Sequence, residues 1–271
     1  MATPRALAFL SDYGLQDAYV GICHGVIRTI EPRIQIIDLT HGVPRHDVRA
    51  GALALDDSVP YTPHDSVILA IVDPGVGHDR RALAIKSADG RVFVGPDNGL
   101  LSHVLQRCGG AVEAREISDS QYCLQPSSNT FHGRDIFAPV AARLATGVEF
   151  DSVGVAVDPH QLVTIAFPVP YEEGNALVVH VVEIDEFGNL RFDAPGAAIR
   201  RAHRDETRRI GLEIAGTKAS VIFGETFAAA KPQEALLLED SNGSLCLAIN
   251  RGNAAQRFGL KLDATVRIVD A

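Results

Sequence analysis

Apolar residues in the first half of the chain alternate between short continuous runs and helical spacing. The short runs predict β-strands at residues 6–12, 33–40 and 66–73. The helical spacing predicts helices at residues 17–30, 47–59, 98–107 and 133–145. A hairpin is predicted to turn at Asp89-Gly90. Alternating strands and helices are typical of the α/β class, in which helices cover both faces of a mostly parallel sheet.

The pattern changes after the segment FPVPYEEGN, which contains two prolines and a cluster of turn residues. Beyond it, short strand-like runs lie at residues 176–185, 209–216, 220–225, 234–240, 244–250 and 265–270. We therefore expect an N-terminal α/β sandwich domain over residues 1–168. An all-β domain, a small barrel or a sandwich, should follow over residues 169–271.

Composition excludes several classes of partner. The 271 residues carry a formal charge of -9 and contain no basic block, which argues against nucleic acid and favours a cationic small molecule. The apolar run at the N-terminus is too short for the core of a signal peptide or for a membrane span. We therefore expect a cytoplasmic protein with no membrane association. The four cysteines form no C-x-x-C pair, and no ligand spacing suggests a metal site.

Charged residues interrupt the apolar runs where the predicted strands end. Asp12, the DLTH segment at residues 38–41 and Asp73 follow the three strands, and the carboxyl ends of parallel strands form ligand crevices. Arg80 follows the turn after Asp73, and His132 precedes the last predicted helix. Each residue alone has a structural explanation, such as a turn or a helix start. Their convergence on one crevice favours a catalytic site.

Five segments, in order, resemble motifs of the S-adenosyl-L-methionine (SAM) hydrolases, also called SAM hydroxide adenosyltransferases. They are SDYGLQDAYVG, VDPGVGHDRRALAI, VGPDNGLLS, TFHGRDIFAPVAARLA and IDEFGNL, and they span nearly the whole chain. The resemblance implies an N-terminal α/β domain, a C-terminal β-barrel and no cofactor. It also implies a homotrimer whose sites lie between subunits.

The resemblance also assigns roles to individual residues. It implies catalytic roles for Asp73, Arg80 and His132. The substrate-binding positions that it implies are Asp12 and Asp17 at the ribose, Phe131, Asp185 at the methionine ammonium, Phe187 and Asn189 at the adenine, and Ser241 and Ala254 in a late segment.

The expected reaction is attack of water on the ribose C5′ of SAM, giving adenosine and L-methionine. A SAM-dependent halogenase and a non-catalytic SAM- or adenosine-binding protein are the alternatives. The related halogenases carry tyrosines where this chain has Asp73 and His132. The fluorinase carries a serine where this chain has Gly133. A nucleotide-cofactor oxidoreductase lacks support, because the turn after the first strand is SDYGLQD and not G-x-G-x-x-G.

Overall fold

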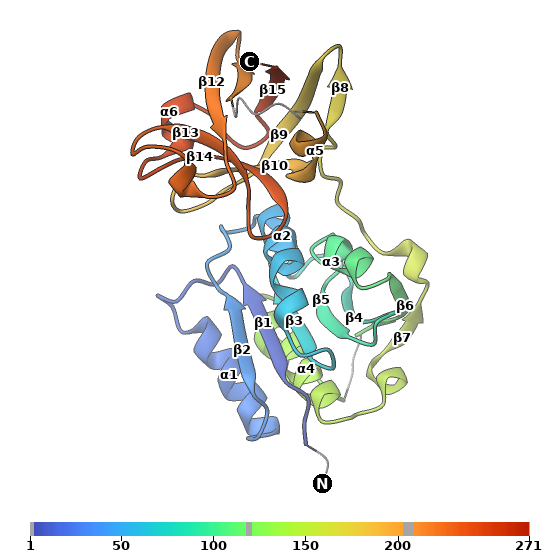
Figure 1. Cartoon of the computed structure of the whole chain (residues 1–271). Helices are drawn as coiled ribbons and strands as arrows, with labels where there is room; N and C mark the ends of the chain where they lie inside the picture. The colour runs from blue at the N-terminus through green and yellow to red at the C-terminus, as the bar shows by residue number, and fades with distance from the viewer. Residues whose placement is uncertain (1–2, 118–120, 203–208, 271) are drawn as a thin grey trace. The chain divides into compact units, whose positions relative to one another are not determined.

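The computed structural model describes residues 3–117, 121–202 and 209–270. Contacts divide the chain into two compact units, residues 1–165 and 166–271, each with its own sheet (Figure 1). Within the described ranges, no helix has the length and apolar character needed to cross a membrane.

The N-terminal unit is built on a seven-stranded sheet of order β2-β1-β3-β5-β4-β6-β7. Its strands are β1 (Leu7–Ser11), β2 (Ile36–Thr40), β3 (Val67–Ile71), β4 (Ala82–Ser87), β5 (Val92–Pro96), β6 (Ala111–Glu116) and β7 (Val155–Val157). Strands β2, β1, β3 and β5 pair in parallel, and β4, β6 and β7 extend the sheet antiparallel. The expected α/β class and the β4–β5 hairpin are confirmed.

Helices cover both faces of this sheet because alternate residues of each strand point to opposite sides. Phe9 packs in one core with residues of α1 and α4, whereas Leu10 packs in the other with residues of α2 and α3. The helices are α1 (Tyr19–Ile30), α2 (Val48–Ser58), α3 (Ser102–Arg107) and α4 (Ala138–Ala145), which follows a π-helical turn (Gly133–Phe137). Asp47 caps α2 as its sequence position suggests, accepting a hydrogen bond from Ala50 N at 2.9 Å.

The C-terminal unit is a closed barrel, and this confirms the expected fold. The ring runs β9-β10-β14-β13-β12-β11-β15 and closes on β9, so its strands have no free edge. Its elements are β8 (Tyr171–Glu173), β9 (Ala176–Ile184), β10 (Leu190–Pro195), α5 (Ala197–Ala202), β11 (Arg209–Ile214), β12 (Thr217–Phe223), β13 (Ala235–Glu239), β14 (Ser244–Ile249), α6 (Ala254–Phe258) and β15 (Thr265–Asp270). Short 3-10 turns in the two units lie at Val59–Tyr61, Phe150–Val153, Pro159–Gln161 and Phe227–Ala229.

Candidate active site

A polar pocket of about 300 Å³ lies in the N-terminal unit. We call it the N-terminal pocket, and its lining residues are Asp12, Tyr13, Asp17, Tyr19, Arg45, His46, Asp73, Val76, Thr130, Phe131, His132 and Gly133. Asp12 and Asp73 reach it because β1 and β3 are parallel neighbours and both residues follow the carboxyl ends of their strands. The predicted crevice therefore brings together Asp12, Asp17, Asp73, Phe131 and His132.

Arg80 joins Asp73 to His132 behind the pocket wall. Its Nε lies 3.0 Å from Asp73 Oδ1, its Nη2 lies 2.6 Å from Asp73 Oδ2, and the same Nη2 lies 2.8 Å from His132 Nδ1. The Arg80 and Asp73 side chains are only 10% and 7% exposed, and the guanidinium stacks 5.1 Å from the Phe137 ring centroid. Such a buried, forked ion pair holds the carboxylate in one orientation.

A close backbone approach joins the turn after Asp73 to the loop that carries His132, and a buried carboxylate anchors that loop. Gly77 has φ +79°, and a Cβ there would lie 2.6 Å from the carbonyl oxygen of Asn129. Beyond His132, the buried Asp135 accepts hydrogen bonds from Arg134 Nε at 2.6 Å and from Ser128 N at 2.8 Å. Glycine at position 77 and the Asp135 anchor therefore fix the loop that carries His132.

The contact with Arg80 determines the tautomer of His132. An arginine has only donors, so Nδ1 must accept, and in the neutral ring the proton is on Nε2. The pKa of His132 is lowered, first by burial and second by the positive charge of Arg80. At neutral pH His132 is therefore an uncharged ring that offers an Nε2–H donor.

We expect the His132 ring to titrate below the ordinary histidine pKa of about 6.5 when followed by NMR. Between the two values only the unfolded chain binds the additional proton, so this residue makes stability fall as pH falls through that window. Arg80→Gln should raise the His132 pKa, because it removes a positive charge and leaves Asp73. An unchanged titration in Arg80→Gln would contradict the contact.

Asp12 lines the same pocket, whose aromatic wall consists of Tyr13, Tyr19 and Phe131. Its Oδ2 accepts a hydrogen bond from the backbone N of His46 at 2.9 Å, and His46 adopts the strained φ of +66°. The Tyr13 ring lies edge-on to Phe131 with centroids 5.8 Å apart, and Tyr19 lies edge-on to Phe131 at 5.1 Å. Burial raises the pKa of Tyr13, so its hydroxyl stays protonated. This wall can hold a flat group while Asp12 accepts hydroxyl donors.

Sequence reasoning missed several residues of this pocket. Tyr13 and Tyr19 lie inside the quoted SDYGLQDAYVG motif, so their proximity to Asp12 was the available signal. Arg45 and His46 lie in a loop without apolar periodicity, and nothing in the sequence pointed to their place in the pocket.

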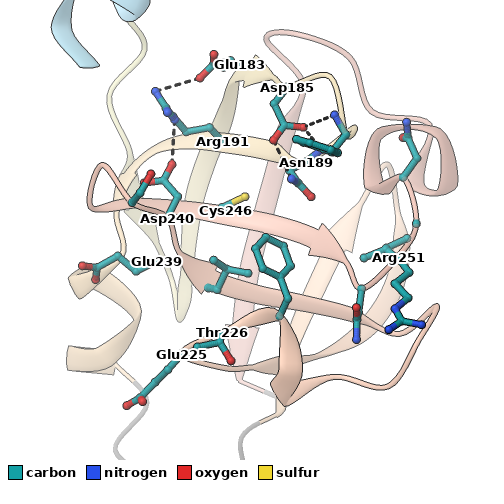
Figure 2. Close-up of a pocket in the computed structure, with 18 residues that line it drawn as sticks. Glu183, Asp185, Asn189, Arg191, Glu225, Thr226, Glu239, Asp240, Cys246 and Arg251 are labelled. Carbon is teal, nitrogen blue, oxygen red and sulfur yellow. Dashed lines mark hydrogen bonds and ion pairs between the residues drawn. The ribbon is translucent and has the colours of Figure 1, made fainter. Parts of the chain in front are cut away.

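A larger pocket of about 970 Å³ opens in the barrel unit (Figure 2). This barrel pocket contains Asp185, Phe187, Asn189 and Ser241, four of the five residues assigned to this unit. Phe187 is 77% exposed and is available to a ligand. Asp185 also organises its own turn, because it accepts hydrogen bonds from Phe187 N at 2.9 Å and from Asn189 Nδ2 at 2.8 Å.

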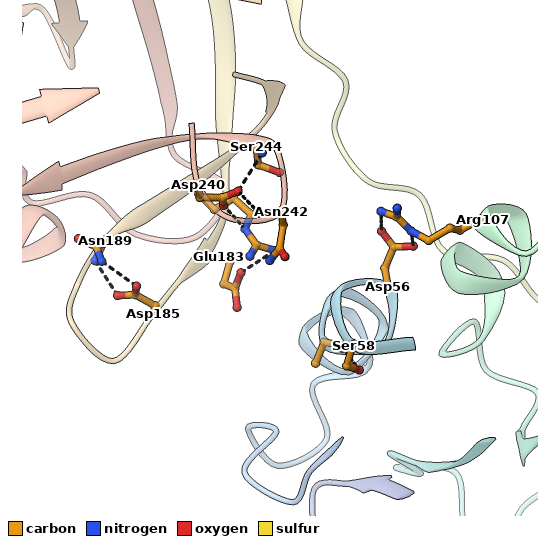
Figure 3. A network of polar contacts seen from close by, with 11 residues as sticks. Asp56, Ser58, Arg107, Glu183, Asp185, Asn189, Asp240, Asn242 and Ser244 are labelled. Atoms are coloured by element: carbon orange, nitrogen blue, oxygen red, sulfur yellow. Dashed lines mark hydrogen bonds and ion pairs between the residues drawn. The ribbon is translucent and has the colours of Figure 1, made fainter. Parts of the chain in front are cut away.

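An ionic network borders the same pocket (Figure 3). Arg191 lies 3.0 Å from both Glu183 Oε2 and Asp240 Oδ2, and Asp240 accepts the backbone N–H of Ser244 at 2.9 Å. The fifth assigned residue, Ala254, does not line the pocket. It is fully buried, and its N–H donates to the carbonyl of Gly188 at 3.1 Å.

The fold defines a class of two-domain protein in which an α/β domain and a β-barrel each contain a pocket. Residues 7–154 match the SAM hydroxide adenosyltransferase N-terminal domain, and residues 179–267 match the C-terminal domain of the same family. The chain belongs to the SAM hydroxide adenosyltransferase family.

Individual relatives agree with this assignment. The chain is 40% identical to the (R)-S-adenosyl-L-methionine hydrolase of Salinispora tropica, over 99% of both chains. The fluorinase of Actinoplanes sp. is a more distant relative, at 28% identity over 98% of this chain and 97% of its own. The crystal structure of an uncharacterized conserved protein from Thermotoga maritima superposes with a TM-score of 0.91 at 32% identity, covering 97% of this chain and 99% of that one.

Proposed function

We propose that the protein hydrolyses SAM to adenosine and L-methionine by attack of water on the ribose C5′. The observation that carries this proposal is the Asp73–Arg80–His132 arrangement, which presents one acceptor and one donor to the N-terminal pocket that also contains Asp12. The family and the curated hydrolase relatives support the same reaction.

The chemistry places its main demand on the nucleophile. The sulfonium makes methionine a neutral leaving group, so catalysis depends on orienting water in line with the C5′–S bond. Asp73 accepts one water proton, and His132 Nε2–H donates to one lone pair of the water and leaves the other directed at C5′. The C5′–S electron pair leaves with methionine, and the proton passes through Asp73 to solvent. Arg80 acts through both partners, holding the Asp73 carboxylate in one orientation and fixing the His132 tautomer.

Binding of the substrate involves both units in this proposal. Asp12 and Asp17 accept the ribose hydroxyls, since a carboxylate can take two donors from a vicinal diol. Phe187 and Asn189 contact adenine, and Asp185 contributes to the acidic surroundings of the methionine ammonium. Acidic side chains outnumber arginines in the barrel pocket, which suits a cationic substrate.

The assembly and the location are proposals as well. The homotrimer with sites between subunits is supported by family membership and by the presence of a separate pocket in each unit. A cytoplasmic location is supported by the buried thiols Cys23, Cys108 and Cys246, which a reducing compartment keeps unoxidised.

We expect adenosine to be the only nucleoside product when the protein is incubated with SAM, even in about molar chloride. Asp73 would offer a halide only carboxylate oxygens, which are acceptors, and a desolvated anion needs donors. Chromatography with mass detection distinguishes adenosine from 5′-chloro- or 5′-fluoro-5′-deoxyadenosine. A halogenated main product would favour the halogenase, and binding of SAM without any turnover would favour the non-catalytic binder.

A further inference from the structure

The three-residue group His24, Asp38 and His41 lies in the N-terminal unit outside the lining of the N-terminal pocket. His24 comes from α1, and the other two residues come from the end of β2, where the DLTH segment was expected to line the crevice. The Nε2 atoms of His24 and His41 lie 2.9 Å and 3.0 Å from the same oxygen, Asp38 Oδ1. We propose that these three side chains bind a divalent transition-metal ion of the zinc class.

The donor atoms have the composition and spacing that such an ion requires. Two imidazole nitrogens and one carboxylate oxygen lie within 4.8 Å of one another. Zinc binds these donors at about 2.0–2.2 Å, which places tetrahedral ligands about 3.3 Å apart. Two of the three separations, 2.9 and 3.0 Å to Asp38 Oδ1, are close to that value, and the third is no more than 4.8 Å.

The surroundings of His41 are those of a metal ligand. Its side chain is 3% exposed, and its Nδ1 lies 2.8 Å from Ser11 Oγ. When an ion occupies Nε2, the proton moves to Nδ1 and is donated to Ser11, which is the outer-shell partner that ligating histidines commonly have. Phe9 packs edge-on against the ring with centroids 4.6 Å apart and limits its rotation.

Solvent reaches the group from one side. The side chains of His24 and Asp38 are 31% and 43% exposed, so an ion has an entry path and room for water as a fourth ligand. No spacing along the chain points to this group, because His24 precedes Asp38 by 14 residues. The group could therefore be found only from the fold.

Ion binding would stiffen part of the N-terminal pocket. Ser11, the partner of His41, directly precedes Asp12, and the His41 carbonyl accepts the N–H of Gly14 at 2.8 Å. The helix that carries His24 begins at Tyr19, which lines the pocket. One ion would therefore tie α1, the end of β2 and the turn at residues 11–14 together.

The test is a titration of metal-free, full-length protein with Co²⁺ and Zn²⁺. We expect one Co²⁺ per chain, with visible absorption bands that Zn²⁺ abolishes, and a Tm that rises with added Zn²⁺. His24→Gln and Asp38→Asn should each lower the affinity for the ion at least about tenfold and remove the rise in Tm. Both replacements are conservative and at partly exposed positions, whereas His41 is buried against Ser11 and Phe9 and is left intact.

The matched control is His64→Gln, an exposed histidine of the same unit that is not part of the group. It should bind Co²⁺ as the unaltered protein does. The proposal is overturned if the unaltered protein binds no Co²⁺ at micromolar concentrations, or if His24→Gln and Asp38→Asn bind it as well as His64→Gln does. Neither result bears on SAM hydrolysis, because the proposed reaction does not use this ion.

Discussion

Replacing Asp73 with asparagine should lower kcat for SAM hydrolysis by about 100-fold or more, with little change in KM. The amide keeps the size of the side chain but cannot accept the water proton. The residues of this pocket proposed to hold the ribose are Asp12 and Asp17, and this substitution leaves them in place. The measurement is adenosine formation by liquid chromatography over a range of SAM concentrations.

A stability loss must be separated from a catalytic loss, because Asp73 belongs to a buried ion pair with Arg80. Asp97→Asn is the matched control: its carboxylate is 5% exposed, pairs with Arg81 at 2.5 Å, and does not line the N-terminal pocket. Breaking either pair costs up to about 3 kcal/mol of folding stability. Both variants should therefore have a lower Tm, and only Asp73→Asn should have a lower kcat. A near-normal kcat in folded Asp73→Asn would show that Asp73 has only a structural role in its turn.

The fold was predictable wherever the apolar pattern was strong. The runs at β1, β2 and β3 are short and apolar, and Asp12 and Asp73 at the ends of parallel neighbours had to meet at one edge. Strand β10 was missed because the prediction relied on continuous apolar runs, whereas in β10 the polar residues Arg191 and Asp193 alternate with buried ones, as in a half-buried strand. Strand β6 escaped for the same reason, since Glu113 and Arg115 interrupt its apolar run.

Five residues that line the N-terminal pocket were named from the sequence, but their contacts were not predictable. The resemblance supplied Asp73, Arg80 and His132 without ranking their roles. That Arg80 donates to His132 Nδ1, and so leaves the proton on Nε2, depends on a 2.8 Å contact between residues 52 apart. No spacing rule along a chain determines a contact of that kind. The same limit hid the packing of Tyr13 against Gly133.

A substitution at Gly133 should have a second large effect on activity, because of this packing against Tyr13. A Cβ on Gly133 would meet the hydroxyl oxygen of Tyr13 well inside contact distance, and it would lie 3.1 Å from Tyr13 Cζ and 3.3 Å from Ile71 Cδ1. Gly133→Ala should therefore push Tyr13 out of place, disturb the adjacent His132 and lower kcat/KM by about 100-fold. Gly133→Ser should do the same, so a serine like that of the fluorinase does not fit here unless Tyr13 changes.

The double variant identifies the cause. Tyr13→Phe removes the hydroxyl that the new Cβ would meet and leaves the ring carbon at 3.1 Å, a contact that a small shift relieves. Gly133→Ala should therefore lower kcat/KM much less in the Tyr13→Phe background than in the unaltered protein. The difference between the two losses should be at least about tenfold. If Tyr13 is not the obstacle, the two losses will simply add in free energy. Such additivity would show that Gly133 is required by the π-helical turn itself and not by its neighbour.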